Sequence, residues 1–352
     1  MGRLIDGEWY TDADLADRGH GGDGAFQREE TSFRDWVRAP GAEVDPAGDA
    51  SAGGADAADP FTAEAGRYHL YVSYACPWAH RTLVTRAILG LDDAVSVDVV
   101  DPVRIDQGWE FAPGKDGCTP DSQFGADYLR EVYTRADPDY TGRVTVPVLW
   151  DTERGTIVNN ESAEIITMFA TAFRDVAGRD VDLYPVDQRE EIDAVIEDVY
   201  ERINNGVYRA GFAGSQAAYD EAVAALFDAM AEYDEVLADR RYLLGESLTL
   251  ADVCLFPTLF RFDSVYHTHF RCNRRRVVDY PNLWGFAREL YRLPGVAATC
   301  RLDHCTTHYY RSHADLNPTG IVPVGPDLDF DAPHDRDRLP GGPPAALRDV
   351  AA

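Results

Sequence analysis

The pattern of hydrophobic and polar positions divides the chain into two halves. In the first half, short apolar runs typical of buried strands alternate with a few helical stretches. From Asp187 onward, apolar residues recur at the three- and four-residue spacing of amphipathic helices. The pattern therefore predicts a mixed α/β domain followed by an all-α domain.

The elements expected in the first half follow one another in the order β-α-β, then β-β-α. They are strands over 68–75, 95–100, 144–150 and 156–158 and helices over 77–89 and 161–173. Pro77 suits the first position of a helix, where its missing N–H is not needed. This order predicts a thioredoxin-like domain.

The second half is predicted to be helical over 187–203, 216–237, 250–263 and 281–291. Before the third helix, Thr249 is the expected N-cap, with Asp252 three residues on as an acidic form of the capping box. We expect an all-helical C-terminal domain over 187–312.

Composition marks the other boundaries. Residues 41–60 are rich in Gly, Ala, Asp and Pro and have little to bury, so residues 1–60 are expected to form an N-terminal extension and loop. The thioredoxin-like domain is then 61–180. Residues 313–352 form a C-terminal extension, which from about Asp331 is Pro-, Gly-, Asp- and Arg-rich and is expected to be loose, with a disordered end.

The net charge is −28, with 61 acidic residues against 33 basic ones, of which only Lys115 is a lysine. Such a surface repels phosphate backbones and argues against a nucleic-acid partner. Abundant carboxylates with almost no lysine suggest adaptation to high salt, which screens their repulsion. An acidic protein from an ordinary cytoplasm is the alternative.

The sequence predicts a soluble, cytoplasmic protein, since no apolar run reaches membrane-span length and the N-terminus lacks a signal-peptide core. Its six cysteines are then expected to be reduced. No CxxC pair is present, and Cys300, Cys305, His304 and His308 lack a second pair at zinc spacing. We therefore expect no metal.

Cys76 is the candidate nucleophile. It lies between an apolar strand and Pro77 in "YVSYACPWAHR", so it should be the N-cap of the following helix. The positive end of the helix dipole favours thiolate over thiol there. His80 and Arg81, one turn on, are candidates to add positive potential. The ordinary alternative is a small buried cysteine that fills space.

Two further parts of the sequence favour a catalytic over a purely structural role for Cys76. Pro147 interrupts a clear strand in "TVPVL", and thioredoxin-like domains carry a cis-proline there that leaves the preceding backbone, here Val146, free to pair with a peptide-like thiol. Glu161 and Ser162 in "NNESAEII" offer a carboxylate, a hydroxyl and free amides at a helix start, which suits a γ-glutamyl group. Capping by Asn160 or Ser162 alone is the alternative.

These residues, in this order, resemble the omega-like and Xi classes of glutathione transferase, and most closely the Xi class, the glutathionyl-hydroquinone reductases. The likeness spans roughly residues 24–327 and is carried by the phrases GRYHLYVSYACPWAHRTL, GRVTVPVLWD, IVNNESAEII, NGVYRAGFA, LTLADVCLFPTLFRFD, HFRCN and HYYRSHADLNPTGIVPVGP. Tyr74, where a small or aliphatic residue is expected, and the loop over 41–60 depart from the family.

The resemblance implies a role for each matching position. Cys76 is the nucleophile, and Tyr208 is the general acid/base for the quinol oxygen. Tyr266 and Tyr309 donate to the thiolate, and Pro147 is structural. The implied glutathione-binding positions are Trp109, Arg143, Val144, Thr145, Val146, Glu161 and Ser162. Without the family, Trp109 and the tyrosines would be taken as amphipathic groups at a domain junction.

The implied reaction is thiol-dependent reduction of S-glutathionyl hydroquinones through a Cys76 mixed disulfide, without a bound cofactor. Glutathione is the co-substrate, or γ-glutamylcysteine if the composition means a halophilic archaeon, and Arg143 is the candidate contact to the glycine carboxylate that distinguishes them. Ala79 replaces the second cysteine of a CxxC enzyme. The family also implies a homodimer. The alternatives are a general thioltransferase and a non-catalytic interaction module.

Overall fold

The computed structural model describes residues 2–11, 26, 31–41 and 61–348, which form two compact units. The first contains the described residues up to 11 and from 31 to 180. The second contains residue 26 and residues 181–348. The two units correspond to an α/β part and a helical part, which agrees with the predicted fold class.

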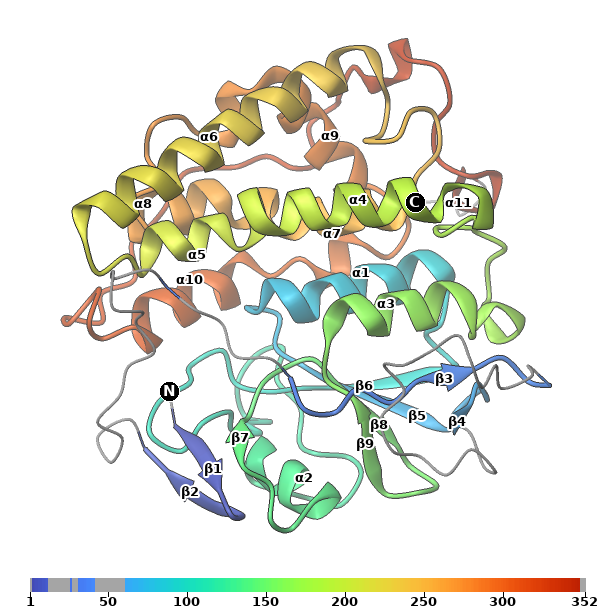
Figure 1. Cartoon of the computed structure of the whole chain (residues 1–352), viewed down its shortest axis with the longest axis vertical. Coiled ribbons are helices and arrows are strands. Elements are labelled where there is room, and N and C mark those ends of the chain that lie inside the picture. Colours follow the sequence, from blue (N-terminus) through green and yellow to red (C-terminus); the bar gives the residue numbers. More distant parts are fainter. Residues whose placement is uncertain (1, 12–25, 27–30, 42–60, 349–352) are drawn as a thin grey trace. The chain divides into compact units, whose positions relative to one another are not determined.

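A four-stranded mixed sheet forms the centre of the first unit, in the order β6-β5-β8-β9. Its strands are β5 (Tyr68–Val72), β6 (Val95–Val99), β8 (Val148–Asp151) and β9 (Thr156–Asn159). β5 runs parallel to β6 and antiparallel to β8, and β8 runs antiparallel to β9. Helices α1 (Pro77–Leu89) and α3 (Ser162–Thr171) pack against each other over one face of this sheet (Figure 1).

The N-terminal segment contributes more structure than the sequence predicts. β1 (Arg3–Ile5) and β2 (Glu8–Tyr10) join β7 (Gly142–Arg143) in a small antiparallel sheet, and β3 (Val37–Arg38) pairs in parallel with β4 (Phe61–Thr62). Helix α2 (Leu129–Ala136) is a further element. Most of the predicted loop, residues 42–60, lies outside the described residues.

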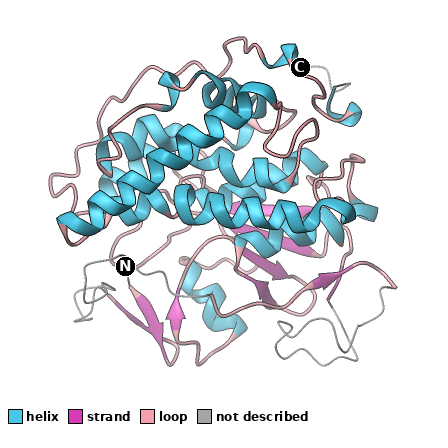
Figure 2. Ribbon diagram, turned by 45° about the horizontal axis from the view of Figure 1, so that its top comes forward, coloured by secondary structure: helices cyan, strands magenta, loops and turns pink. Residues whose placement is uncertain are grey.

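The second unit is built from helices, drawn in cyan in Figure 2. They are α4 (Arg189–Val199), α5 (Gly206–Gly211), α6 (Gln216–Asp239), α7 (Leu250–Arg261), α8 (His267–His269), α9 (Pro281–Tyr291), α10 (Leu302–Ser312) and α11 (Ala345–Arg348). π-helical turns follow α4 at Tyr200–Asn204 and α7 at Phe262–Tyr266. Short 3₁₀ turns of this unit lie at Val186–Gln188, Val277–Asp279, Ala297–Thr299 and Arg336–Arg338, while the turn at Arg174–Val176 belongs to the first unit.

Helix α7 begins at the capping box that the sequence predicts. The Asp252 carboxylate accepts hydrogen bonds from the Thr249 amide and the Leu243 amide, both at 2.8 Å. Burial is the larger influence on this carboxyl, and it raises the pKa of Asp252 to about 7 despite these hydrogen bonds. The cap thus fixes the start of a helix that is buried along its whole length.

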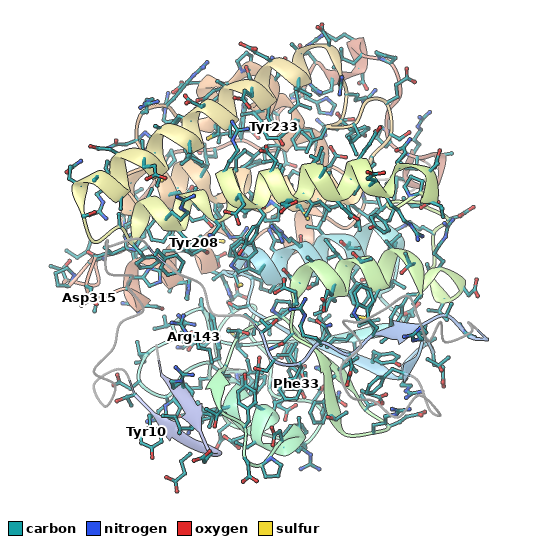
Figure 3. All side chains as sticks on the ribbon, viewed as in Figure 1. Tyr10, Phe33, Arg143, Tyr208, Tyr233 and Asp315 are labelled. Atoms are coloured by element: carbon teal, nitrogen blue, oxygen red, sulfur yellow. The ribbon has the colours of Figure 1, made fainter. Side chains whose placement is uncertain are left out.

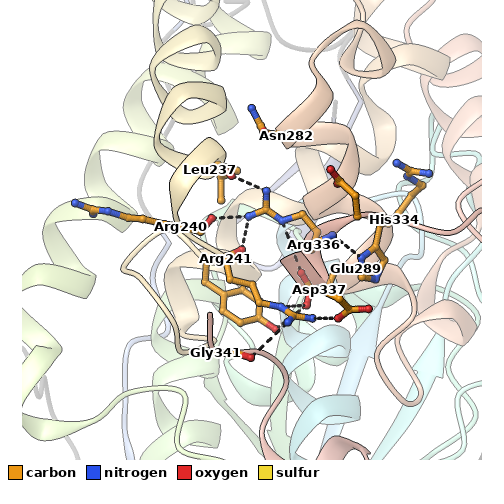
Figure 4. Close-up of polar contacts among 12 residues, drawn as sticks. Leu237, Arg240, Arg241, Asn282, Glu289, His334, Arg336, Asp337 and Gly341 are labelled. Atoms are coloured by element: carbon orange, nitrogen blue, oxygen red, sulfur yellow. Dashed lines mark hydrogen bonds and ion pairs between the residues drawn. The ribbon is translucent and has the colours of Figure 1, made fainter. Parts of the chain in front are cut away.

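The C-terminal segment corrects the prediction of a loose tail from Asp331. Arg336 is 0% exposed, and its guanidinium donates to the carbonyl oxygens of Leu237, Arg240 and Arg241, each at 2.6 Å (Figure 4). Leu237 lies in the last turn of α6, where carbonyls run out of helical N–H partners, and Arg240 and Arg241 directly follow the helix. Composition predicts a loose tail because apolar groups are few, but the tail is anchored by the buried Arg336 cation at a helix terminus and by Asp337, whose carboxylate accepts from Arg241 at 2.7 Å.

Candidate active site

Cys76 is the N-cap of α1, with extended backbone dihedrals (φ −76°, ψ 120°), and it is half-buried. Its carbonyl accepts from the His80 amide at 2.9 Å, while its thiol donates to the Val146 carbonyl at 3.5 Å. That contact suits the protonated thiol. A thiolate would be repelled by the carbonyl oxygen and attracted by the free amides at the start of α1.

The loop that faces the thiol carries the cis Val146–Pro147 peptide bond that the sequence predicts. The predicted strand over 144–150 is in fact interrupted here, since β7 ends at Arg143 and β8 begins at Val148. Pro147 cannot donate to a strand ladder, so the pairing resumes only beyond it. Val146 is 5% exposed, and its backbone therefore lies beside Cys76 rather than in the sheet.

Tyr133 of α2 holds this loop, and sequence reasoning missed it. The Thr145 amide donates to the Tyr133 hydroxyl at 3.2 Å, and that hydroxyl donates to the Thr145 carbonyl at 2.9 Å. The Asn160 side-chain amide also donates to it at 3.0 Å. Burial raises the pKa of Tyr133 to about 12, so it remains a hydroxyl at neutral pH. One buried residue thus ties the 145–147 loop to the start of α3.

Glu161 and Ser162 stand at the start of α3, as predicted. Glu161 is the N-cap, and its carboxylate accepts from the Ala163 amide at 3.3 Å and from the Ser162 hydroxyl at 3.4 Å. The Glu161 amide donates to the Asn159 side-chain oxygen at 2.7 Å. Ser162 is only 2% exposed, so the partly exposed Glu161 carboxylate is the group that solvent and ligands can reach.

The remaining predicted positions of the first unit lie in different settings. Arg143 belongs to β7, where it pairs with Arg3, and its carbonyl accepts from the Tyr140 hydroxyl at 3.1 Å (Figure 3). Trp109 is 3% exposed, with the Arg104 guanidinium 5.0 Å from its ring centroid. Trp109 is therefore a buried residue with a cation over its face.

His80 and Arg81, the candidates for extra positive potential, are both buried in α1. His80 is 0% exposed, and Arg81 is 2% exposed with its guanidinium 4.6 Å from the centroid of the Trp78 ring. Arg81 therefore makes a cation–π contact on its own helix.

In the second unit, the hydroxyls of all three predicted tyrosines meet. The Tyr309 hydroxyl of α10 is hydrogen-bonded to the Tyr208 hydroxyl of α5 and lies 3.0 Å from the Tyr266 hydroxyl. Tyr208 is labelled in Figure 3. Tyr266 and Tyr309 are 0% and 1% exposed, whereas Tyr208 is half-buried. Burial raises the pKa of both Tyr266 and Tyr309 well above the ordinary value, so each keeps its proton at neutral pH.

Aromatic rings enclose this hydroxyl chain. Phe270 contacts Tyr208, Tyr266 and Tyr309 at centroid distances of 5.4–5.5 Å. A Cβ on Gly211 would lie 2.3 Å from the Phe270 ring, so glycine is required for the ring to pack against α5. The three tyrosine hydroxyls thus form a hydrogen-bonded chain that is surrounded by aromatic rings, and Tyr208 is its partly exposed member.

Two of the other cysteines, Cys272 and Cys300, are poor nucleophiles. Burial raises the pKa of Cys272 and of Cys300 to about 12 each. Within the described part of the chain, no group of three or more His, Cys, Asp or Glu side chains is arranged to hold a metal ion. Nor is any helix of these residues long and apolar enough to cross a membrane.

Comparison with known proteins places these features in a family. Residues 75–172 match the glutathione S-transferase N-terminal domain and residues 216–289 the C-terminal domain. The chain is 49% identical over 338 residues to glutathionyl-hydroquinone reductase YqjG of Escherichia coli, covering 96% of this chain and 99% of the relative. The chain belongs to the glutathionyl-hydroquinone reductase family. A second member, PcpF of Sphingobium chlorophenolicum, is 50% identical over 326 residues, or 93% and 96% of the two chains.

Solved structures agree with this assignment to the glutathione transferases. The Xi-class glutathione transferase of Natrialba magadii superposes with a TM-score of 0.86 at 55% identity, over 97% of this chain and 98% of that one. Glutathione-bound YqjG superposes with a TM-score of 0.84 at 47% identity, over 96% and 99%. The resemblance to the Xi class noted in the sequence is therefore confirmed.

Proposed function

We propose that the chain reduces S-glutathionyl hydroquinones to hydroquinones, with Cys76 as the nucleophile and glutathione as co-substrate. The observation that carries this proposal is the half-buried Cys76 thiol at the N-cap of α1 beside Val146. It occurs in a chain 49% identical, over nearly its full length, to a glutathionyl-hydroquinone reductase. Ala79 stands where a CxxC enzyme has its second cysteine, which argues against a dithiol mechanism and supports a single nucleophilic cysteine.

Glutathione would be held by the first unit. The Val146 backbone would pair with the cysteinyl part, while the Glu161 carboxylate and the amides at the start of α3 would take the γ-glutamyl ammonium and carboxylate. Arg143 is proposed to meet the glycine carboxylate. Glutathione in the YqjG structure supports a thiol ligand of this kind.

The first half-reaction transfers the glutathionyl sulfur. Thiolate Cys76 attacks that sulfur, the carbon–sulfur bond to the ring breaks, and its electron pair remains on the ring carbon, which takes a proton. Hydroquinone leaves, and Cys76 is left in a mixed disulfide. A second glutathione attacks this disulfide, so that glutathione disulfide leaves and the thiolate returns. The net reaction consumes one glutathione and one S-glutathionyl hydroquinone.

Tyr208 is proposed to manage the proton at the quinol oxygen. Its hydroxyl is bonded to Tyr309, whose hydroxyl is bonded to Tyr266. Since the two buried hydroxyls stay protonated, they can donate along this chain and stabilise Tyr208 when it gives up its proton. These contacts support a second role for Tyr266 and Tyr309, which is to stabilise the deprotonated Tyr208. The resemblance itself implies that they donate to the thiolate.

The test compares two substrates with the wild-type protein and the Tyr208→Phe variant. Wild type should release hydroquinone from S-glutathionyl hydroquinone, and Tyr208→Phe should lose roughly 100-fold or more of that rate. Both should turn over hydroxyethyl disulfide with glutathione at similar rates, because that reaction needs no proton at a quinol oxygen. Disulfide turnover without any hydroquinone release would instead indicate a general thioltransferase.

The same assay identifies the thiol. S-(γ-glutamylcysteinyl) hydroquinone lacks the glycine carboxylate, so an Arg143→Gln variant should weaken turnover of the glutathionyl substrate only. Equal loss with both substrates would contradict the proposed role of Arg143.

A further inference from the structure

Strands β5 and β6 carry a polar cluster that contains none of the residues assigned to the thiol site. In the parallel register of these strands, His69 lies opposite Ser96 and Tyr71 opposite Asp98. Since side chains alternate along a strand, these four residues share one face of the sheet. Strand β6 is an edge strand of the sheet (Figure 1). The register thus sets a hydroxyl, an imidazole and a carboxylate side by side at this edge.

The contacts within the cluster form a directed series. Ser96 Oγ lies 2.7 Å from His69 Nδ1, and His69 Nε2 lies 3.1 Å from Asp98 Oδ2. The Thr119 hydroxyl donates to Asp98 Oδ1 at 3.1 Å, and the Ser122 amide to Oδ2 at 2.6 Å. The imidazole therefore contacts a hydroxyl through Nδ1, while Nε2 lies close to a carboxylate fixed by two other donors without forming a hydrogen bond to it.

The charge on Asp98 sets the tautomer of His69. Burial by itself raises the pKa of the Asp98 carboxyl, but the contacts with His69 and with the Ser122 amide outweigh it, so the pKa lies below the ordinary value. An ionised carboxylate beside Nε2 favours the proton on that nitrogen. Nδ1 then carries one lone pair, which the Ser96 hydroxyl at 2.7 Å shares with the more distant Gln123 side-chain amide.

Exposure differs sharply along the series. His69 is 0% and Asp98 4% exposed, whereas Ser96 is exposed. Gln123 Nε2 lies 3.2 Å from His69 Nδ1. When Nδ1 takes a proton, this amide loses its acceptor and becomes available to an oxyanion on Ser96. The buried His69 imidazole therefore contacts the solvent-exposed Ser96 hydroxyl, and the Gln123 side-chain amide lies beside both as a hydrogen-bond donor.

We propose that Ser96 is an activated serine that takes acyl groups from small activated esters, with His69 as the base and Asp98 as a positioning residue. Ser96 Oγ bonds to the carbonyl carbon while its proton passes to His69 Nδ1. The alkoxide or phenoxide then leaves with that proton. Water attacks the acyl-serine in the same way, with His69 again taking and returning the proton, and a carboxylic acid is released.

The test measures acylation of Ser96 against a serine of the same protein. Ser122 is also exposed and lacks an imidazole contact among the bonds described for it. The protein carries Cys76→Ser, because the thiolate also attacks esters. After timed exposure to 4-nitrophenyl acetate, acetyl groups on the two serines are quantified by peptide mass spectrometry. We expect Ser96 to react at least about 100-fold faster than Ser122.

Two variants separate catalysis from structure. Asp98→Asn should lower the Ser96 rate at least about 10-fold while the Ser122 rate and the circular dichroism spectrum stay unchanged. His69→Gln should remove the difference in acylation rate between Ser96 and Ser122, because no base then accepts the Ser96 proton. Further titratable groups face this cluster: Tyr71, with its ring 4.5 Å from that of His69, Asp121, which accepts from the Tyr71 hydroxyl, and Arg135, whose charge acts on Tyr71. Equal rates at Ser96 and Ser122 in folded protein would overturn the proposal and leave the cluster as a cross-link between β5 and β6.

Discussion

Replacing Arg336 with methionine should destabilise the helical unit by about 3–5 kcal/mol, the usual cost of removing one partner from a buried ionic contact. Its guanidinium is fully buried on three carbonyl oxygens at the end of α6, each 2.6 Å away. Hydrogen bonds to a charged group contribute about 1.5–3 kcal/mol each. Three do not add fully, because burial of the guanidinium offsets part of the gain, as its lowered pKa indicates.

The substitution also removes the cation nearest to the second oxygen of a buried carboxylate. Glu289 Oε2 lies 3.8 Å from Arg336 Nε, while Oε1 keeps its bond from Arg241 at 2.7 Å (Figure 4). Glu289 is 2% exposed, so the lost attraction is not replaced by solvent. This places the expected cost in the upper part of the range rather than below it.

Urea unfolding and amide hydrogen exchange of peptides from α6 measure the effect. Arg338→Met is the matched control, since that side chain is 44% exposed and donates to the Ala238 carbonyl at 3.0 Å. The control should cost no more than about 1 kcal/mol. If Arg336→Met stays within 1 kcal/mol of Arg338→Met, with α6 exchange unchanged, the tail is not held by this residue.

Three further predictions concern titration and the tyrosine chain. Iodoacetamide at pH 8 should modify Cys76 at least about 100-fold faster than Cys272, whose thiol pKa is raised to about 12; comparable rates by peptide mass spectrometry would contradict the assigned nucleophile. Because the pKa of Asp252 is raised to about 7, the folded state holds its proton more tightly, and the stability this group contributes is complete below about pH 4 and lost as the pH rises to 7. Unfolding of wild type and Asp252→Asn across that window should differ in slope by up to about 1.4 kcal/mol per pH unit, and parallel curves would disprove the raised pKa. Tyr266→Phe should lower kcat for hydroquinone release about 10-fold with KM for glutathione unchanged, whereas a change in KM alone would place Tyr266 outside the chemistry.

Local sequence signals predict the elements that local chemistry determines. Helix α1 begins at Pro77 and ends before Gly90, whose φ of 65° suits glycine as a helix stop, so both ends follow from residue type. The capping box of α7 is found for the same reason. The predicted strand over 144–150 begins too early, because hydrophobic alternation does not show that Pro147 interrupts the strand pairing.

Tertiary contacts determine what the sequence does not reveal. Nothing local marks Tyr133 as the residue that holds the 145–147 loop, since its partners are 12 and 27 residues away. The roles of the tyrosines at 208, 266 and 309 are predicted only from the family resemblance, because their hydroxyls meet across sequence separations of up to 101 residues. Arg336 is missed because a polar residue in a polar segment is usually solvated.

Single-turnover mass spectrometry of the reduced protein with S-glutathionyl hydroquinone tests the central claim most directly. Wild type should gain one glutathione on Cys76 as one equivalent of free hydroquinone appears, and added glutathione should remove the adduct. Cys76→Ser should show neither the adduct nor the product. Hydroquinone release by folded Cys76→Ser at the wild-type rate, or an adduct on another cysteine, would contradict the assignment of Cys76 as the nucleophile.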